Sequence, residues 1–211
     1  MKAGGRGRGR LGEIVDAPND FVFGMDRTGR RLMTLEKGGD IRRDLERPIE
    51  FESDESLFIS ILLRRHPSQT DQGQSLQLSL EPDLPGRGRR LHQTISFGIT
   101  TDGFPFINSG NKITKTASRV IVDETVFCVL KLAVSVDSTQ PSLRVYRISE
   151  IIDSIEPTSW TVVGDLGSTE HAPTSLRIVA GEAAAWELDE LRLGTSWDSV
   201  SRNHKNDSSG N

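Results

Sequence analysis

Apolar residues recur at every second position along most of this chain, and this period constrains the fold more than any other feature. The clearest example is SLQLSLEP, in which Leu76, Leu78 and Leu80 alternate with polar residues. The same period recurs in DFVFGM (20–25), TISFGIT (94–100), SLRVYRI (142–148) and TSLRIVA (174–180). A period of two is that of a β-strand with one buried face, so these segments predict half-buried strands.

Two further segments are apolar on both faces: SLFISILLR (56–64) and TVFCVLKLAVSV (125–136). Strands of this kind are covered on both sides, which predicts that both lie centrally in a sheet. Turn residues punctuate roughly eleven strand candidates, and only ISEIIDSI (148–155) has helical spacing. The pattern predicts an all-β protein, a two-sheet antiparallel β-sandwich formed by residues 20–200 as a single domain.

The two ends differ in composition from this domain. The start contains GGRGRGR (4–10) and the end reads SRNHKNDSSGN, so segments 1–19 and 201–211 are expected to be disordered. Glycine-arginine repeats can bind RNA, but with three arginines here and a net charge of -4, no nucleic-acid partner is expected. No apolar run is long enough to span a membrane, and no signal peptide is evident, which leaves the localisation open.

The chain has one cysteine and offers little for a metal. Cys128 lies among apolar neighbours, which predicts a buried structural thiol. The four histidines lack metal-ligand spacing, so no metal site is expected. Calcium could draw on Asp102, Asp123 or Asp165, but no loop has a calcium-binding pattern, and no cofactor is therefore expected.

The segment AWELDELRLGTSWDSV (185–200) changes the phase of its alternation. Trp186 and Leu188 share one parity, whereas Leu191 and Leu193 share the other. A strand with a bulge or a bend near Asp189 and Glu190 would produce this switch of the apolar phase. Gly194 is then expected to end the strand with an unusual backbone angle.

The stretch LDELRLGTSWDSV resembles the closing strand of concanavalin A-like (laminin G-like) jelly-roll domains from bacterial surface and sensor-type proteins. That strand reads F-D-E-I-R-I-G-x-T-W-x-x-V, and Leu188 stands here in place of its phenylalanine. The resemblance covers roughly residues 20 to 200 and implies a concanavalin A-like jelly roll. Such relatives are mostly extracytoplasmic. They begin with a glycine-rich first strand that is not found here, which predicts a truncated N-terminal segment.

Laminarinase-like glycoside hydrolases share this jelly roll and place three carboxylates on one strand as E-x-D-x-E or E-x-D-x-x-E. Glu187 and Asp189 match the first two positions, but Leu191 or Arg192 stands at the third. Glu190 has the wrong parity to replace the missing carboxylate unless a bulge intervenes. Because retaining glycosidases need two carboxyls close together, no catalytic residue is expected and glycosidase activity is the less favoured alternative.

The resemblance therefore suggests a non-catalytic binding module for a carbohydrate or a cell-surface ligand. The alternative is a structural spacer or protein-interaction domain without a small ligand. Trp186 is expected in the core and Trp197 as a plug that folds back on the strand. Trp160 lies in the polar loop IEPTSWTV, so the predicted ligand-binding residues are Trp160, with Tyr146 and Arg144 as companions.

Overall fold

The computed structural model describes residues 13–16, 31–49, 55–67, 75–82, 94–109, 112–135, 138–165 and 172–201. The predictions made for DFVFGM and for the tail after residue 201 lie outside these residues. The first strand lies within the N-terminal segment that was expected to be disordered, and the rest of that segment is outside the described residues.

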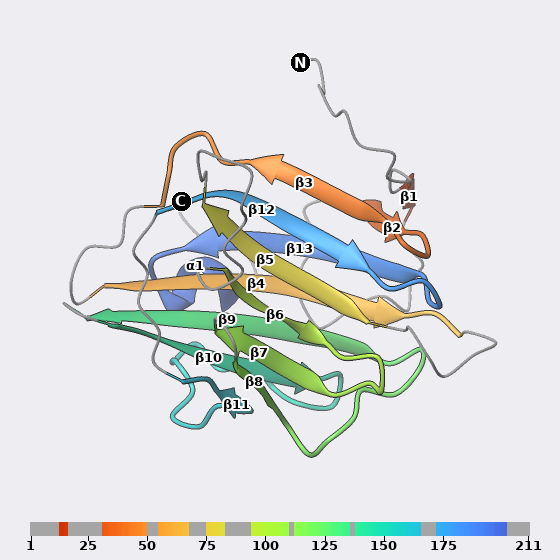
Figure 1. Cartoon of the computed structure of the whole chain (residues 1–211). Coiled ribbons are helices and arrows are strands. Elements are labelled where there is room, and N and C mark those ends of the chain that lie inside the picture. The colour runs from red at the N-terminus through yellow and green to blue at the C-terminus, as the bar shows by residue number, and fades with distance from the viewer. Residues whose placement is uncertain are drawn as a thin grey trace, which may run out of the picture.

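Two antiparallel sheets stack face to face, so the prediction of an all-β, two-sheet antiparallel sandwich is confirmed. The seven-stranded sheet contains, in spatial order, β1 (Glu13–Asp16), β2 (Arg31–Leu35), β13 (Trp186–Gly194), β4 (Ser56–Arg65), β9 (Thr125–Ser135), β10 (Ser138–Arg147) and β11 (Val162–Val163). The six-stranded sheet contains β3 (Asp40–Asp44), β12 (Pro173–Ala180), β5 (Leu76–Pro82), β6 (Ile95–Ile99), β7 (Pro105–Ser109) and β8 (Lys112–Lys115). Figure 1 shows the six-stranded sheet lying in front of the other. Several neighbouring strands come from distant parts of the chain, such as β2 and β13 or β3 and β12, as in a jelly roll.

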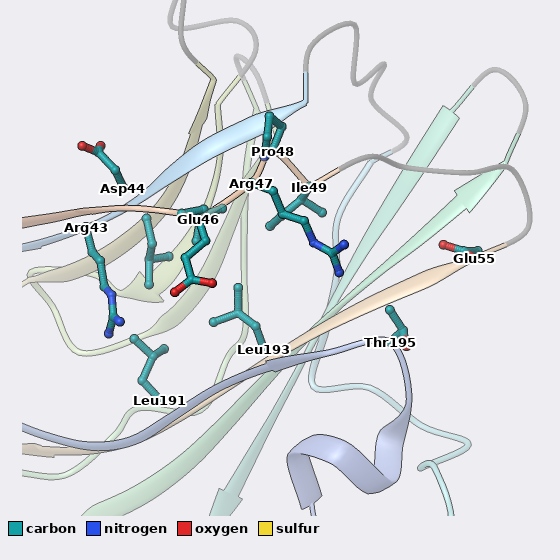
Figure 2. A pocket seen from close by; sticks show the side chains of 12 residues that line it. Arg43, Asp44, Glu46, Arg47, Pro48, Ile49, Glu55, Leu191, Leu193 and Thr195 are labelled. Carbon is teal, nitrogen blue, oxygen red and sulfur yellow. The ribbon is translucent and has the colours of Figure 1, made fainter.

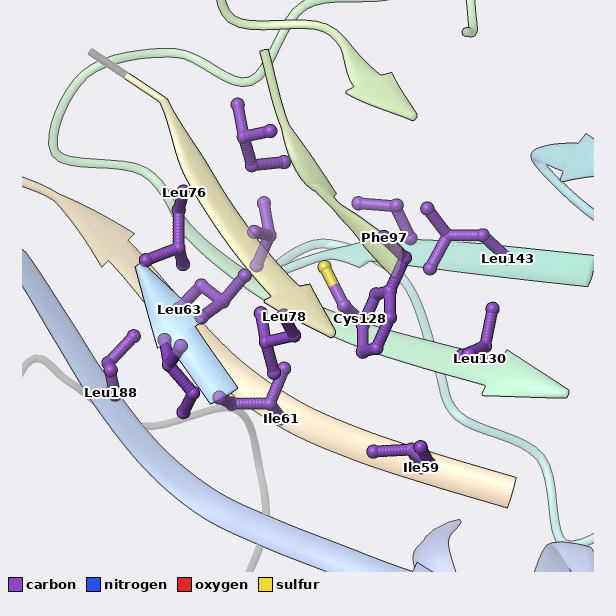
Figure 3. Packing of buried hydrophobic residues seen from close by; sticks show 14 of the residues in the cluster. Ile59, Ile61, Leu63, Leu76, Leu78, Phe97, Cys128, Leu130, Leu143 and Leu188 are labelled. Carbon is purple, nitrogen blue, oxygen red and sulfur yellow. The ribbon is translucent and has the colours of Figure 1, made fainter. Parts of the chain in front are cut away.

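The main core lies between the two sheets and consists of the apolar face that each strand turns inward. Leu76 and Leu78 of β5 and Phe97 of β6 face Ile61 of β4 and Cys128 of β9 across this layer (Figure 3). All five side chains are almost fully buried. Since each CH₂ group removed from water contributes about 0.8 kcal/mol, this layer is the main source of stability.

A second apolar cluster covers the outer face of the seven-stranded sheet. It contains Phe58, Leu62, Phe127, Val129, Tyr146, Trp197 and Val200. The last two belong to the short helix α1 (Trp197–Ser201), which packs on this face. The strands β4 and β9 are therefore covered on both sides, as their apolar sequences predicted. Trp197 also donates a hydrogen bond from Nε1 to the Asp153 carbonyl at 2.9 Å, which confirms its predicted role as a plug.

The predicted bulge is present in β13. The register against β4 shifts between Asp189 and Arg192, and Glu190 adopts a left-handed backbone with φ of 51°. Trp186 and Leu188 face the main core, and after the bulge Leu193 lies opposite the core residue Ile59. Leu191 has the same parity as Leu193 and therefore shares its face.

Two local features differ from what the sequence pattern favoured. The backbone of Gly194 is not left-handed, so the predicted unusual angle is wrong. Glycine is needed instead because α1 folds back, and a Cβ there would lie 2.6 Å from Cβ of Ser199. The helical spacing at 148–155 does not give a helix, because these residues form turns, bends and irregular backbone. The segment TDGF forms a turn that joins β6 to β7, with Gly103 at φ of 86°.

Candidate functional site

An open cavity of about 850 Å³ lies at one end of the sandwich, where the edge strand β3 stands across from the second half of β13. We call it the end pocket. It is lined by Arg43, Asp44, Leu45, Glu46, Arg47, Pro48, Ile49, Glu55, Leu176, Leu191, Leu193 and Thr195. Figure 2 shows Arg43 and Glu46 reaching from the β3 side toward Leu191 and Leu193. The volume falls in the range of about 300–1,000 Å³ that is usual for small-ligand sites.

Two features of local structure create the end pocket. The bulge at Glu190 turns Leu191 and Leu193 toward the interior, yet each remains 38% exposed because none of the described strands of the opposite sheet covers them fully. On β3, Arg43 pairs with Leu176 of β12, which faces the core, so Arg43 points inward as well. An arginine therefore occupies a core-facing position beside half-exposed leucines.

Five charged side chains line the end pocket, and one of them, Asp44, is paired with Arg42. Among the residues that the structure describes, Arg43, Glu46, Arg47 and Glu55 form no ion pair. Most other cations are paired: Arg42 contacts Asp44 at 3.5 Å, and Arg147 contacts Glu124 at 2.6 Å. Two guanidinium groups and two carboxylates are thus available to a ligand above an aliphatic floor.

The backbone beside the end pocket is also partly available. β2 pairs with β13 only at Trp186, Glu187 and Leu188. Beyond the bulge, the described strands pair with β13 only on its β4 side, through Arg192, Leu193 and Gly194. Leu191 and Leu193 of this stretch line the end pocket.

The outer face of the six-stranded sheet is polar, but its charges are satisfied within the chain. Arg177 donates two hydrogen bonds to Asp40, at 2.8 and 2.5 Å, and one to Glu81 at 3.4 Å. The hydrogen bond to Asp40 raises the pKa of Arg177 further above its ordinary value. This face is the solvated side of an antiparallel sheet.

The structure brings the three predicted ligand-binding residues together on the outer face of the seven-stranded sheet. Trp160 is partly buried against the cluster that contains Tyr146, and the Arg144 guanidinium lies 4.8 Å from the Tyr146 ring centre. Tyr146 is only 4% exposed, and burial raises its pKa. Arg144 is bound to Glu150 at 2.6 Å. Only Trp160 offers ring surface to solvent, and the assignment stays a prediction.

The carboxylates of the closing strand have structural partners. Glu187 is buried, and its two oxygens contact Arg64 Nε at 2.5 Å and His66 Nε2 at 3.1 Å. Glu190 pairs with Arg192 at 2.5 Å, and Asp189 accepts a hydrogen bond from the Glu190 amide. Leu191, at the third position of the E-x-D-x-E pattern, points to the opposite side of the strand from Glu187.

The acidic residues considered for calcium are dispersed. The Thr100 hydroxyl donates a hydrogen bond to Asp102 and lowers its pKa, and Lys115 lies 3.4 Å from the same carboxylate. Asp165 pairs with Lys112. Within the described ranges, no group of three or more acidic, histidine or cysteine side chains could hold a metal ion.

Two further observations concern the rest of the described chain. Cys128 is buried in the main core as predicted, and burial raises its pKa to about 12. None of the described helices is long and apolar enough to cross a membrane.

The sequence matches no known family and no curated protein. Solved structures resemble it only in fold. They include the GH43 protein BlXynB from Bacillus licheniformis, at 12% identity and a TM-score of 0.45, over 78% of this chain and 33% of that one. The cellulose induced protein Cip1, at 8% identity and a TM-score of 0.47, is matched over 89% of this chain and 88% of its own. A legume lectin-like domain from Entamoeba histolytica, at 9% identity and a TM-score of 0.45, is matched over 88% of each chain.

The chain spans about a third of the length of BlXynB. Identities this low and TM-scores below 0.5 carry no argument about a ligand or a reaction. Fold alone does not determine function, so the class of activity has to be argued from the site.

Sequence reasoning missed the end pocket. Its floor was visible, because the phase change placed Leu191 and Leu193 on the inner side of β13. Its charged rim was not visible in the sequence, because the DIRRD segment of β3 has no apolar alternation. Only the pairing of β3 with β12 shows that Arg43 faces inward.

Proposed function

We propose that this protein is a non-catalytic binding module whose carbohydrate ligand enters the end pocket. The proposal rests on one observation. Arg43 faces inward, forms no ion pair among the described residues and lies beside the half-exposed Leu191 and Leu193. A charged side chain and exposed leucines at core-facing positions conflict with simple sandwich packing. Such local conflicts are expected at functional sites.

The chemistry of the end pocket suits a sugar. A sugar ring presents C–H groups on its faces and hydroxyls at its edge. The aliphatic floor can contact the ring face, while Glu46 and Glu55 accept hydrogen bonds from hydroxyls and Arg43 and Arg47 donate to oxygens. An acidic sugar fits best, because a guanidinium binds a carboxylate through two parallel hydrogen bonds.

The partners of the closing-strand carboxylates support the absence of glycosidase chemistry. A retaining mechanism needs a nucleophile and a separate acid/base on the same face. Both oxygens of Glu187 are held by Arg64 and His66, and the third position of the pattern is a leucine that faces away. We therefore expect no cleavage of laminarin or mixed-linkage glucan.

A glycan array probed with wild type, Arg43→Ala, Arg42→Ala and Trp160→Ala tests the proposal, with and without calcium. Arg42 and Arg43 are adjacent on β3 but point to opposite faces, so Arg42→Ala is the matched control. We expect wild type to bind a small set of acidic glycans. Arg43→Ala should lose at least about tenfold in signal, since an arginine that becomes covered by its ligand is often a dominant contributor to binding energy, while the other two variants should retain it.

The binding of the variants distinguishes the proposed site from the alternative site and the alternative functions. Loss of binding in Trp160→Ala with retention in Arg43→Ala would transfer the site to the predicted Trp160 surface. No binding to any glycan would contradict the proposal and support the spacer alternative. Cleavage of laminarin that disappears in Glu187→Gln would overturn the non-catalytic assignment.

A further inference from the structure

A loop on the outer face of the seven-stranded sheet, opposite the inner face that lines the end pocket, exposes several large aliphatic side chains. It connects β10 to β11 on the outer face of the seven-stranded sheet. Ile148 is 60% exposed, Ile151 is 83% exposed and Ile155 is 76% exposed. A fourth residue, Ile121 at 63%, lies in the turn whose Glu124 and Arg119 are bonded to Arg147, next to Ile148. We call these four residues the isoleucine patch.

The exposure of the isoleucine patch is built into the fold, because the loop is fixed at several points. Ile152 and Trp160 pack on the outer cluster, and the Asp153 carbonyl accepts the Trp197 hydrogen bond. Thr161 accepts a hydrogen bond from the Val145 amide at 3.0 Å. A fixed loop that turns inward at Ile152 presents its neighbours to solvent. Clustered exposed apolar side chains of this kind mark interaction surfaces.

The charges around the isoleucine patch indicate what covers it. Glu124 pairs with Arg147 at 2.6 Å, Glu150 with Arg144 at 2.6 Å, and Glu156 with Lys131 at 2.5 Å. Three exposed charges, Asp153, Asp123 and Arg119, form no ion pair among the described residues, so together they leave one net negative charge. A surface on which most ions are matched offers little field to attract a strongly charged partner. An identical surface can approach it with repulsion between one net negative charge per copy, which salt screens.

We propose that the isoleucine patch is a self-association surface, on which a second copy of this chain docks about a two-fold axis. In a two-fold interface the same patch on each copy meets itself, so an apolar centre with an internally paired rim is self-complementary. The dimer would leave the end pocket of each copy free, because that pocket lies between β3 and β13. The inference does not depend on the ligand proposed for the end pocket.

Sedimentation equilibrium over low to high micromolar concentrations tests this proposal. Wild type should form dimers reversibly, and association should hold or strengthen as salt is raised. Ile151→Asp and Ile155→Asp should each weaken association by at least about tenfold, as expected for central residues of an interface. The matched control is Ile113→Asp, an isoleucine 60% exposed on β8, which should change association by no more than about twofold.

Circular dichroism and thermal melting of both patch variants exclude misfolding, and two separate substitutions keep the test valid if one misfolds. A wild type that stays monomeric at every concentration would overturn the proposal. Equal weakening by Ile113→Asp would do so too, because the effect would not belong to the patch. A monomer that instead co-sediments with phosphatidylcholine vesicles would overturn the proposal and show that the isoleucine patch binds a lipid surface.

Discussion

Glu190 determines the course of the last strand. Its left-handed backbone inserts an extra residue opposite β4, so that apolar residues of opposite parity on either side of it reach one face. The phase change between Leu188 and Leu191 was sufficient to predict this bulge from sequence. The same residue creates the floor of the end pocket, because it turns Leu191 and Leu193 inward.

The cost of this backbone conformation can be measured. An L-residue in the left-handed region costs roughly 1–2 kcal/mol, and a β-branched side chain tolerates it worst. We expect Glu190→Val to lower the free energy of unfolding by about 1–2 kcal/mol more than Glu190→Gly in urea titrations. Both variants lose the Arg192 ion pair, so their difference reports on the backbone. Equal stabilities would show that φ at this position carries no strain.

The buried thiol of Cys128 should make the stability of the fold depend on pH. Burial raises the pKa of its thiol from an ordinary value near 9 to about 12. Between these values the unfolded chain releases the proton while the folded chain retains it, so stability should fall as pH rises through this window. Urea unfolding at about pH 8 and about pH 10 should show a smaller decrease for Cys128→Ala than for wild type. An identical decrease in both would mean that other groups cause it.

At the scale of elements, sequence patterns identified those strands that carry apolar alternation. β5, β6, β10 and β12 were predicted from their period of two, and β4 and β9 from their apolar character on both faces. β3 was not identified, because an edge strand that reads DIRRD buries little. The helix α1 was also missed, since five residues are too few to show a helical period.

The docking of α1 depends on Gly194. A Cβ at this position would meet the side chain of Ser199, so Gly194→Ala should displace α1 and lower the free energy of unfolding by about 1–3 kcal/mol. Ser199→Gly removes the obstructing atoms, and the double variant should recover part of that loss. Chemical denaturation of the two single variants and the double variant gives the coupling free energy between positions 194 and 199. Strictly additive effects would show that the two residues do not meet.

At the scale of the whole molecule, function depends on contacts that no local pattern encodes. The predicted trio Trp160, Tyr146 and Arg144 does come together, because β10 and the loop after it lie on one face. The end pocket instead combines residues from β3, β12 and β13 with residues 45–49, Glu55 and Thr195, which only the stacking of the two sheets brings together. The sequence predicts the sandwich, whereas the position of the pocket follows from which strands form its open end.

A crystal structure of the protein bound to the best glycan from the array is the most direct test of the proposed site. The account predicts ligand density in the end pocket, with a sugar ring against Leu191 and Leu193 and with oxygens within hydrogen-bonding distance of Arg43. Density over Trp160 or on the outer face of the six-stranded sheet would contradict it. An end pocket filled by the protein's own chain would contradict it equally.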